Sequence, residues 1–285
     1  MSEPPGARAR LPFLAIGHTA RDEFSDGRWR LGGSALYGAA TAAKLGADVT
    51  LVTRVGPRER ESLETLCQEL GITLRTLPSD VTTTFGFTYD AEGRRSLYLR
   101  AKAAPITRSE VGRAGRSPKA VLLASIAGEL DDSLFAPWSG AKRVLAAQGM
   151  LRSFGPDGLV MPSPWAGYAH LLPKVDAVVV SEEDHAEDRA WLPYTTVVVT
   201  KAEHGSELHS RGETAEIAAF AVRVVIDQTG AGDAFAASLA LGLAEGLPLV
   251  EAATFASAAA SFAVEGLGMS RLADRARVRA RMGKR

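Results

Sequence analysis

The chain has 285 residues, which suits one large α/β domain with a sizeable core. It carries 33 Lys and Arg against 33 Asp and Glu, so net charge gives no reason to expect nucleic acid or an anionic membrane as a partner. Cys67 is the single cysteine, which excludes an intramolecular disulfide and suits a small buried hydrophobe. Without an apolar run of membrane-spanning length or a signal-peptide core in residues 1–10, we expect a cytoplasmic protein.

The first part of the chain alternates strand and helix. Residues 11–17 form a nearly continuous apolar run, typical of a strand buried on both faces of a parallel sheet. A helix is predicted to begin at Ser34 as its N-cap and to end before Gly46. In chain order we predict strand 11–17, a hairpin-like segment 21–31, helix 34–45, strand 49–55 and helix 58–70 with Pro57 at its first turn.

The pattern then changes to two β-rich runs, 82–89 and 96–100, which flank a turn at 90–93 with no helix between them. We place this hairpin outside the main sheet, where it forms a small β lid from two discontinuous segments, about 21–31 and 82–100. The alternation resumes with strands 120–125, 143–147, 177–180 and 196–200, a hairpin of 207–210 with 216–220, and helices 233–244 and 249–265.

These elements predict an α/β fold with a doubly wound, mostly parallel sheet, helices on both of its faces and the β lid, all as one domain over residues 1–285. The last fifteen residues are strongly basic, with seven Lys and Arg against Asp274 alone. They indicate either a solvated terminal helix or a tail that attracts phosphate.

The stretch Asp227-Gln228-Thr229-Gly230-Ala231-Gly232-Asp233 is the main functional signal. It follows an apolar run at 222–226, interpreted as a strand, and opens an Ala/Leu-rich helix. Bare amide groups at such a helix start attract an anion, and the helix dipole adds to this attraction. A carboxylate at Asp233 fits a general base that deprotonates a hydroxyl while the amides of Gly230, Ala231 and Gly232 stabilise a phosphoryl group. The alternative is a glycine turn before a helix with an acidic N-terminus.

Residues 226–233 resemble the C-terminal signature of the ribokinase-like (phosphofructokinase B type) carbohydrate kinases. Gly32-Gly33 and the run Leu45 to Gly56 resemble that family's N-terminal signature, in family order. The resemblance implies the fold described above, ATP and Mg²⁺ as cofactors, and a lid that doubles as a homodimer surface in relatives. A P-loop kinase is excluded because the chain lacks the Gly-x-x-x-x-Gly-Lys-Ser/Thr motif.

For the acceptor substrate, the resemblance assigns hydrogen bonds with hydroxyls to Asp22, whose carboxylate can accept from two of them, and places Gly32 and Gly33 against the substrate. A solvated loop acid is the alternative for Asp22. Tyr37 stands where many members have Asn. A subset that resembles the inositol- and nucleoside-type kinases also has an aromatic residue there, and the alternative is a buried core tyrosine. Gln148 and Arg152 resemble a Gln-Gly-x-Leu-Arg stretch of the same subset that meets substrate or phosphate; Arg152 is equally suited to a structural ion pair.

For the donor and the metal, Ser181-Glu182-Glu183-Asp184 resembles the family's Asn-x-x-Glu motif, which implies Mg²⁺ held by Asp184 through water. An acidic first turn of a helix is the alternative. The nucleotide turn is implied at Thr200, Ala202 and Gly205, with Thr229 beyond it, although Ala202 replaces a glycine and would be strained at positive φ. Asp227 corresponds to a residue that orders a monovalent cation such as K⁺ in some relatives.

Together these features predict an ATP-dependent kinase that phosphorylates a small polyhydroxy substrate, which is a sugar, a cyclitol or a nucleoside. Two alternatives are a kinase of a vitamin-type heterocyclic alcohol, which the predicted lid disfavours, and an inactive sugar- or nucleotide-binding regulator, which the intact glycines and Asp233 disfavour. The sequence does not identify the acceptor, the hydroxyl that is phosphorylated, the dependence on a monovalent cation or the oligomeric state.

Overall fold

A computed structural model describes residues 10–89, 95–112, 117–135, 138, 140–184 and 188–284. Residues 1–9 and the predicted lid turn at 90–93 lie outside the described residues. Within the described ranges, none of the helices is both long enough and apolar enough to cross a membrane.

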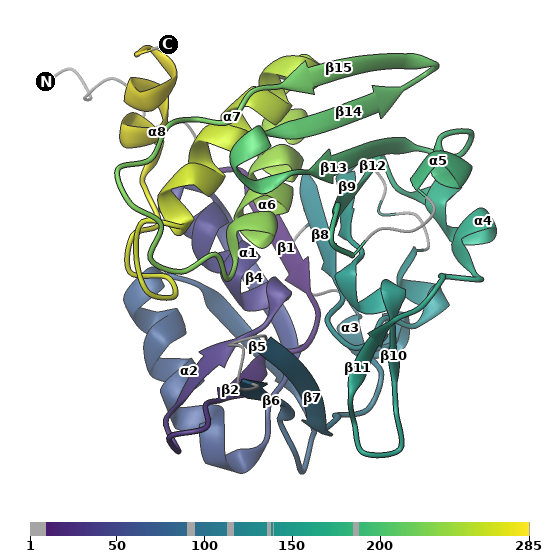
Figure 1. Ribbon diagram of the computed structural model, residues 1–285, viewed down its shortest axis with the longest axis vertical. Helices are drawn as coiled ribbons and strands as arrows, with labels where there is room; N and C mark the ends of the chain where they lie inside the picture. Colours follow the sequence, from purple (N-terminus) through teal and green to yellow (C-terminus); the bar gives the residue numbers. More distant parts are fainter. Residues whose placement is uncertain are drawn as a thin grey trace, which may run out of the picture.

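The central sheet has nine strands in the order β15-β14-β13-β12-β9-β8-β1-β4-β5 (Figure 1). Every neighbouring pair from β13 to β5 is parallel, and β14 and β15 form an antiparallel hairpin at one edge. The strands are β1 Pro12–Ile16, β4 Asp48–Arg54, β5 Thr73–Leu77, β8 Ala120–Ala124, β9 Lys142–Ala146, β12 Ala177–Ser181, β13 Thr196–Thr200, β14 Ser206–Ser210 and β15 Glu213–Ile217. The apolar first strand is central, as its continuous hydrophobicity predicts.

Both faces of the sheet are covered, which confirms the doubly wound prediction. The long helices α1 Ser34–Lys44, α2 Pro57–Leu70, α6 Ala231–Ala244 and α7 Leu249–Ala263 build one core layer with the sheet. Short helices α3 Arg108–Val111, α4 Tyr168–Leu171 and α5 Asp188–Trp191, together with buried tryptophans, build the other. Small residues bring α1 close to the sheet: a Cβ at Gly38 would lie 2.2 Å from the Leu122 side chain. Cys67 is buried in the first layer, as predicted.

The two segments predicted for the lid pair with each other in a separate four-stranded sheet. Its order is β3 Trp29–Gly32, β2 Ala20–Glu23, β6 Thr83–Tyr89 and β7 Arg95–Ala101, with β2 parallel to β6. Ala20 and Phe85 of this sheet pack on Ile126 and Ala127, which follow strand β8. The lid therefore lies over the carboxyl end of the central strands, where ligands bind in such sheets.

One strand and one short hairpin were not predicted from the sequence. Strand β5 is an edge strand of mixed polarity, so it lacks the apolar run of the buried strands. The hairpin of β10 Arg152–Phe154 with β11 Val160–Pro162 is too short for a periodic signal, and it joins the lid through a bond from Leu99 N to Gly158 O of 2.8 Å.

Three local predictions were wrong. Ser34 is not the N-cap of α1, because Gly33 takes that position at a φ of 100° and Ser34 is already helical. Strand β15 begins at residue 213 instead of 216, because Arg211 and Gly212 both adopt positive φ and form a tight two-residue turn. Residues 222–226 are not a strand: they are irregular, and Val224, Val225 and Ile226 are each 52% exposed.

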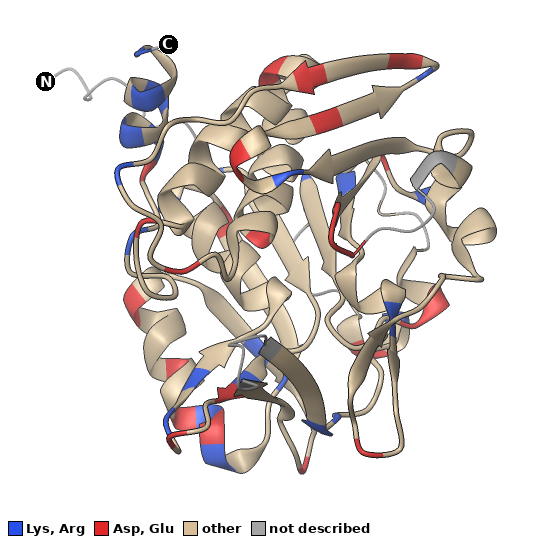
Figure 2. Cartoon of the chain, in the orientation of Figure 1, with Lys and Arg blue, Asp and Glu red and all other residues tan. Residues whose placement is uncertain are grey.

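The basic C-terminal segment folds as helix α8, Arg275–Met282, and packs on α7 (Figure 2). Arg275 pairs with Glu245 through two bonds of 2.8 and 2.6 Å, and Arg281 pairs with Glu265 at 3.0 Å. These contacts favour the terminal-helix interpretation over a free tail.

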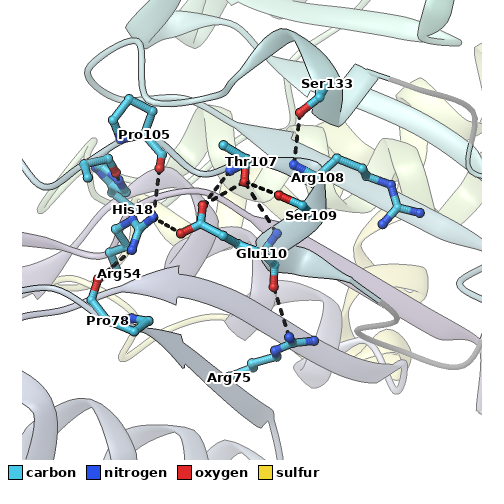
Figure 3. A network of polar contacts seen from close by, with 11 residues as sticks. His18, Arg54, Arg75, Pro78, Pro105, Thr107, Arg108, Ser109, Glu110 and Ser133 are labelled. Atoms are coloured by element: carbon cyan, nitrogen blue, oxygen red, sulfur yellow. Dashed lines mark hydrogen bonds and ion pairs between the residues drawn. The ribbon is translucent and has the colours of Figure 1, made fainter.

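A buried polar network ties the end of β4 to α3 on the other side of the sheet (Figure 3). Arg54 is only 5% exposed, and its guanidinium donates to Glu110, to Pro78 O at 2.5 Å and to Pro105 O at 3.0 Å. Nearby, buried His18 bonds Ala104 O at 2.9 Å through Nε2, and burial lowers the pKa of its imidazole. These contacts fix the loop that leads from β1 into the lid.

Candidate active site

A cavity of ≈ 1180 Å³ lies between the lid, the carboxyl ends of the strands and the N-terminus of α6. It brings together every predicted site residue except Gly32. The predicted residues that line it are Asp22, Gly33, Tyr37, Gln148, Arg152, Asp184, Thr200, Ala202, Gly205, Asp227, Thr229, Gly230, Ala231, Gly232 and Asp233.

Asp233 occupies the first turn of α6 and reaches the cavity. Burial raises the pKa of its carboxyl from the ordinary 3.8 to about 6, and the charges of Asp184 and Asp22 act in the same direction. A hydrogen bond with the Ser34 side chain and the charge of Arg152 oppose this increase. A carboxylate with a pKa near 6 is well matched to accept a proton from a hydroxyl near neutral pH.

The backbone before Asp233 presents amide groups to the cavity. Gly230 caps the helix at a φ of 85°, and the Ala231 amide makes a long 3.3 Å contact with Gln228 O. Within the described part of the chain, no acceptor bonds the amides of Gly232 and Asp233. A Cβ at Gly232 would meet nothing within 4 Å, so this turn of the helix borders open space, and Gly232 lines the cavity. These amides are the arrangement that an anionic group requires at a helix start.

Asp22 lies on lid strand β2 and is 6% exposed. Gly32 makes room for it, because a Cβ at Gly32 would lie 2.5 Å from Asp22 Oδ2. Gly33 instead allows the close approach of the preceding loop, since a Cβ there would lie 2.5 Å from His18 O. Gly32 therefore stands behind the carboxylate, which is why it does not line the cavity, and only Gly33 faces it.

Tyr37 on helix α1 is fully buried at 1% exposure, yet its ring forms part of the cavity wall. A Cβ at Gly230 would lie 2.2 Å from the ring, so the tyrosine limits the space available to the loop at Gly230. Its hydroxyl is buried without a hydrogen-bond partner among the described residues, and burial raises its pKa.

Arg152 lies at the start of β10 and donates to Ile126 O at 3.1 Å. Ile126 belongs to a loop that the buried carboxylate of Glu129 holds through bonds from the Ile126 and Ala127 amides at 3.0 and 2.8 Å. The positive charge of Arg152 lowers the pKa of both Asp184 and Asp233. The Arg152 charge therefore acts on two carboxylates of the cavity, which suits contact with a transferred phosphoryl group.

Asp184 follows β12, and its Oδ2 accepts from Gln148 Nε2 at 3.2 Å. Burial raises the pKa of Asp184, although Arg152 and Gln148 act against this increase. No group of three or more His, Cys, Asp or Glu side chains gathers to hold a metal ion in the described ranges. One carboxylate in a cavity of phosphate-binding size nevertheless fits Mg²⁺, because this ion keeps most of its waters and binds substrate phosphates.

The turn after β13, to which the family resemblance assigns the nucleotide, has one strained position. Ala202 adopts a φ of 46°, in the left-handed region that glycine favours, so the expected strain is present. Gly205 has a φ of 87°, and a Cβ there would lie 2.1 Å from Ile217 O. A glycine at position 205 therefore allows the end of β15 to pack closely on the turn, and it also lines the cavity.

One end of the cavity is apolar, which the sequence analysis missed. The residues that line it are Phe220, Val225 and Ile226 of the irregular segment after β15, Ala260 on α7, and Val264 at the end of that helix. The hydrophobic run at 222–226 is thus exposed to the cavity instead of being buried in the sheet. An apolar slot of this kind suits a planar ring.

Arg30 is the main polar residue that the sequence analysis missed. It lies on β3 opposite Asp22 and bonds Asp227 Oδ2 at 2.5 Å and Thr229 Oγ1 at 3.0 Å. Its place on a hairpin, in register with the predicted Asp22, is the signal that could have identified it.

The fold and this site define a phosphotransferase of ribokinase-like architecture, a class whose members act on small alcohols. The chain belongs to the pfkB family of carbohydrate kinases, whose family model matches residues 19–274.

Its relatives agree with this assignment. The chain is 35% identical to inositol 3-kinase of Zea mays over 127 residues, and this aligned stretch covers 43% of this chain and 33% of that protein. It is 49% identical to the bifunctional protein HldE of Trichlorobacter lovleyi over 75 residues, which cover 26% of this chain and 15% of that protein. The chain therefore spans less than half the length of these curated relatives.

Solved structures show the same fold. A pyrophosphate-dependent kinase of the ribokinase family, complexed with a pyrophosphate analog and myo-inositol, superposes with a TM-score of 0.77 at 21% identity, over 90% of this chain and 96% of that one. Arabidopsis thaliana ribokinase, complexed with ribose and ATP, gives 0.75 at 20% identity, over 96% and 99%.

Proposed function

We propose that the protein transfers the γ-phosphoryl group of ATP to a hydroxyl of a small polyhydroxy acceptor, which is a sugar, a cyclitol or a nucleoside. The observation that carries this proposal is the carboxylate of Asp233, with its pKa of about 6, directly behind the open amides of α6 and in one cavity with Asp22. The acceptor hydroxyl lies between the two carboxylates in this proposal.

In this proposal Asp22 accepts hydrogen bonds from acceptor hydroxyls, and Asp233 removes the proton of the hydroxyl that attacks. The amides of Gly232 and Asp233 and the guanidinium of Arg152 stabilise charge on the phosphoryl group. Bound Mg²⁺ neutralises charge on the donor phosphates, and Asp184 would hold it through water.

The lid contributes the apolar side chains of Phe85, Phe87 and Leu97 to the wall of the cavity. A ring with one face of C–H bonds and a rim of hydroxyls suits such a wall. Inositols are therefore the first acceptors to test, and the inositol 3-kinases among the relatives support this order.

The donor is the second variable. The apolar end around Val225 and Val264 supports a nucleoside triphosphate, since pyrophosphate has no apolar part to bury there. The pyrophosphate-dependent kinases among the structural neighbours make pyrophosphate the alternative donor.

The test is a matrix of ATP and pyrophosphate against inositols, pentoses, hexoses and nucleosides, with phosphorylated product detected by mass spectrometry. We expect ATP with at least one acceptor to give Asp233-dependent product. If product forms with pyrophosphate and not with ATP, pyrophosphate replaces ATP as the proposed donor. The absence of product in every combination would refute the kinase proposal.

The resemblance also proposes a homodimer through the lid, where Trp29 is 38% exposed. Light scattering on the purified protein and on a Trp29→Lys variant tests this proposal, because the variant should lower the dimer fraction if the lid is the interface.

A further inference from the structure

Arg30 joins the two halves of the site. It belongs to the lid, whereas its partners Asp227 and Thr229 immediately precede the loop at Gly230. Its Nε lies 3.7 Å from Asp22 Oδ2 and is buried without a hydrogen-bond partner among the described residues. One guanidinium therefore faces the carboxylate proposed for the acceptor and also holds the segment that leads into the phosphate-facing amides.

Both oxygens of the Asp227 carboxylate accept hydrogen bonds from this chain. Its Oδ1 accepts from the Thr229 amide at 3.0 Å, and its Oδ2 accepts from the Gly268 amide at 3.2 Å and from Arg30. Although burial favours the neutral acid, the bonds from Thr229, Arg30 and Gly268 hold the pKa of Asp227 below its ordinary value.

A monovalent cation, which the family resemblance raises at Asp227, does not fit this arrangement. Such an ion needs several free oxygen ligands, and a guanidinium with its own positive charge lies 2.5 Å from the carboxylate oxygen that would bind it. Arg30 supplies the same sign of charge at the same place and is covalently fixed to the lid.

We propose that Arg30 is a positioning residue whose guanidinium takes the place of the monovalent cation at Asp227, orders the segment Asp227 to Gly230, and makes phosphoryl transfer independent of K⁺. This inference rests on the proposed kinase function.

The experiment measures kinase turnover of the full chain with and without 100 mM KCl, replaced by choline chloride at equal ionic strength. We expect wild-type turnover to change by less than about twofold. In Arg30→Ala we expect turnover to fall by roughly 10- to 100-fold, the usual cost of losing charge-assisted hydrogen bonds, and to recover several-fold with K⁺ or guanidinium chloride. Arg30→Lys, which keeps the charge, should retain more activity than Arg30→Ala.

The matched control is Arg28→Ala, on the same hairpin, because Arg28 is 82% exposed and pairs only with Asp26 among the described residues. It should behave as wild type. A second readout is the melting temperature: K⁺ should raise it for Arg30→Ala relative to choline, and leave it unchanged for wild type.

Wild-type activity that rises more than fivefold with K⁺ would overturn the inference. So would full activity in Arg30→Ala, or a folded Arg30→Ala protein that neither salt rescues. If wild type transfers no phosphoryl group to any acceptor, the proposed function fails instead, and the melting temperatures still decide whether Arg30 excludes the ion.

Discussion

Replacement of Asp233 by Asn should remove activity and, at the same time, stabilise the protein. The Asn side chain has nearly the same shape and can keep the bond with Ser34, but it cannot take a proton. We expect kcat to fall by roughly 10²–10⁴-fold, the range for loss of a general base. Turnover above a tenth of wild type would remove Asp233 from that role.

The stability gain follows from the raised pKa. The shift from 3.8 to about 6 is about two pKa units, so the ionised carboxylate costs the folded state up to about 3 kcal/mol above pH 6. Because Asp233 lines an open cavity, water screens part of this cost, and we expect ~1–3 kcal/mol. Well below pH 3.8 the carboxyl is protonated in both folded and unfolded chains, and the cost vanishes.

The assay is chemical denaturation of wild type and Asp233→Asn between pH 4 and 8. The difference in unfolding free energy should grow as pH rises from about 4 to about 6 and then stay constant. Glu251→Gln is the matched control, since Glu251 is an exposed acid in the first turn of α7. A difference that does not depend on pH, or one that grows toward low pH, would show that Asp233 is not held in an environment that disfavours its charge.

Five further variants test the remaining site. Gly232→Ala adds a methyl group in open space beside the proposed phosphoryl site, so it should leave the melting temperature unchanged and lower kcat by roughly 10²-fold. Gly230→Ala should instead lower the free energy of unfolding by ~1–3 kcal/mol, because residue 230 has a positive φ and its Cβ would meet the Tyr37 ring. Asp22→Ala should weaken acceptor binding by roughly 10- to 100-fold in calorimetry and leave ATP binding nearly unchanged; the opposite pattern would contradict the division of the site. Ala202→Gly should relieve the left-handed strain and raise stability by ~1 kcal/mol, or about 2–4 °C in melting temperature; a lower melting temperature would mean that chain entropy outweighs this strain. Arg152→Gln removes a positive charge that lowers the pKa of Asp233, so the acidic limb of the kcat/KM–pH profile should move to higher pH from about 6. An unchanged limb would show that the Arg152 charge does not influence the titration of Asp233.

Much of this architecture could be predicted because the signals are local. A buried parallel strand such as β1 shows as a continuous apolar run, and a glycine pair or a glycine-rich helix start marks backbone conformations that few other residues adopt. Asp233 was predicted from the glycine-rich helix start that precedes it, whereas the family resemblance assigned Asp22 and the residues after β12 and β13. The residues after β12 and β13 share one edge because the carboxyl ends of parallel strands meet there.

The missed features depend on contacts between distant segments. Ser34 has the side chain of an N-cap, but in the fold it reaches Asp233, which no pattern near residue 34 reveals. Arg30 shows no motif, and its role appears only when β3 is set beside the loop at Asp227. The run at 222–226 has the hydrophobicity of a strand, yet its side chains face a ligand-sized cavity, and periodicity does not distinguish these two surroundings.

The hydrogen bond between Arg30 and Asp227 spans 197 positions of the chain, and this span constrains how the protein is made. During synthesis the lid strands and most of the central sheet leave the ribosome long before α6, so the apolar face that α6 and α7 cover remains exposed to solvent until the end. A nascent chain that stops short of residue 227 would contain Asp22 without the helix start that lines the same cavity. Translation speed and chaperone capture over the last sixty residues should therefore govern the yield of active protein more than changes in the first hundred.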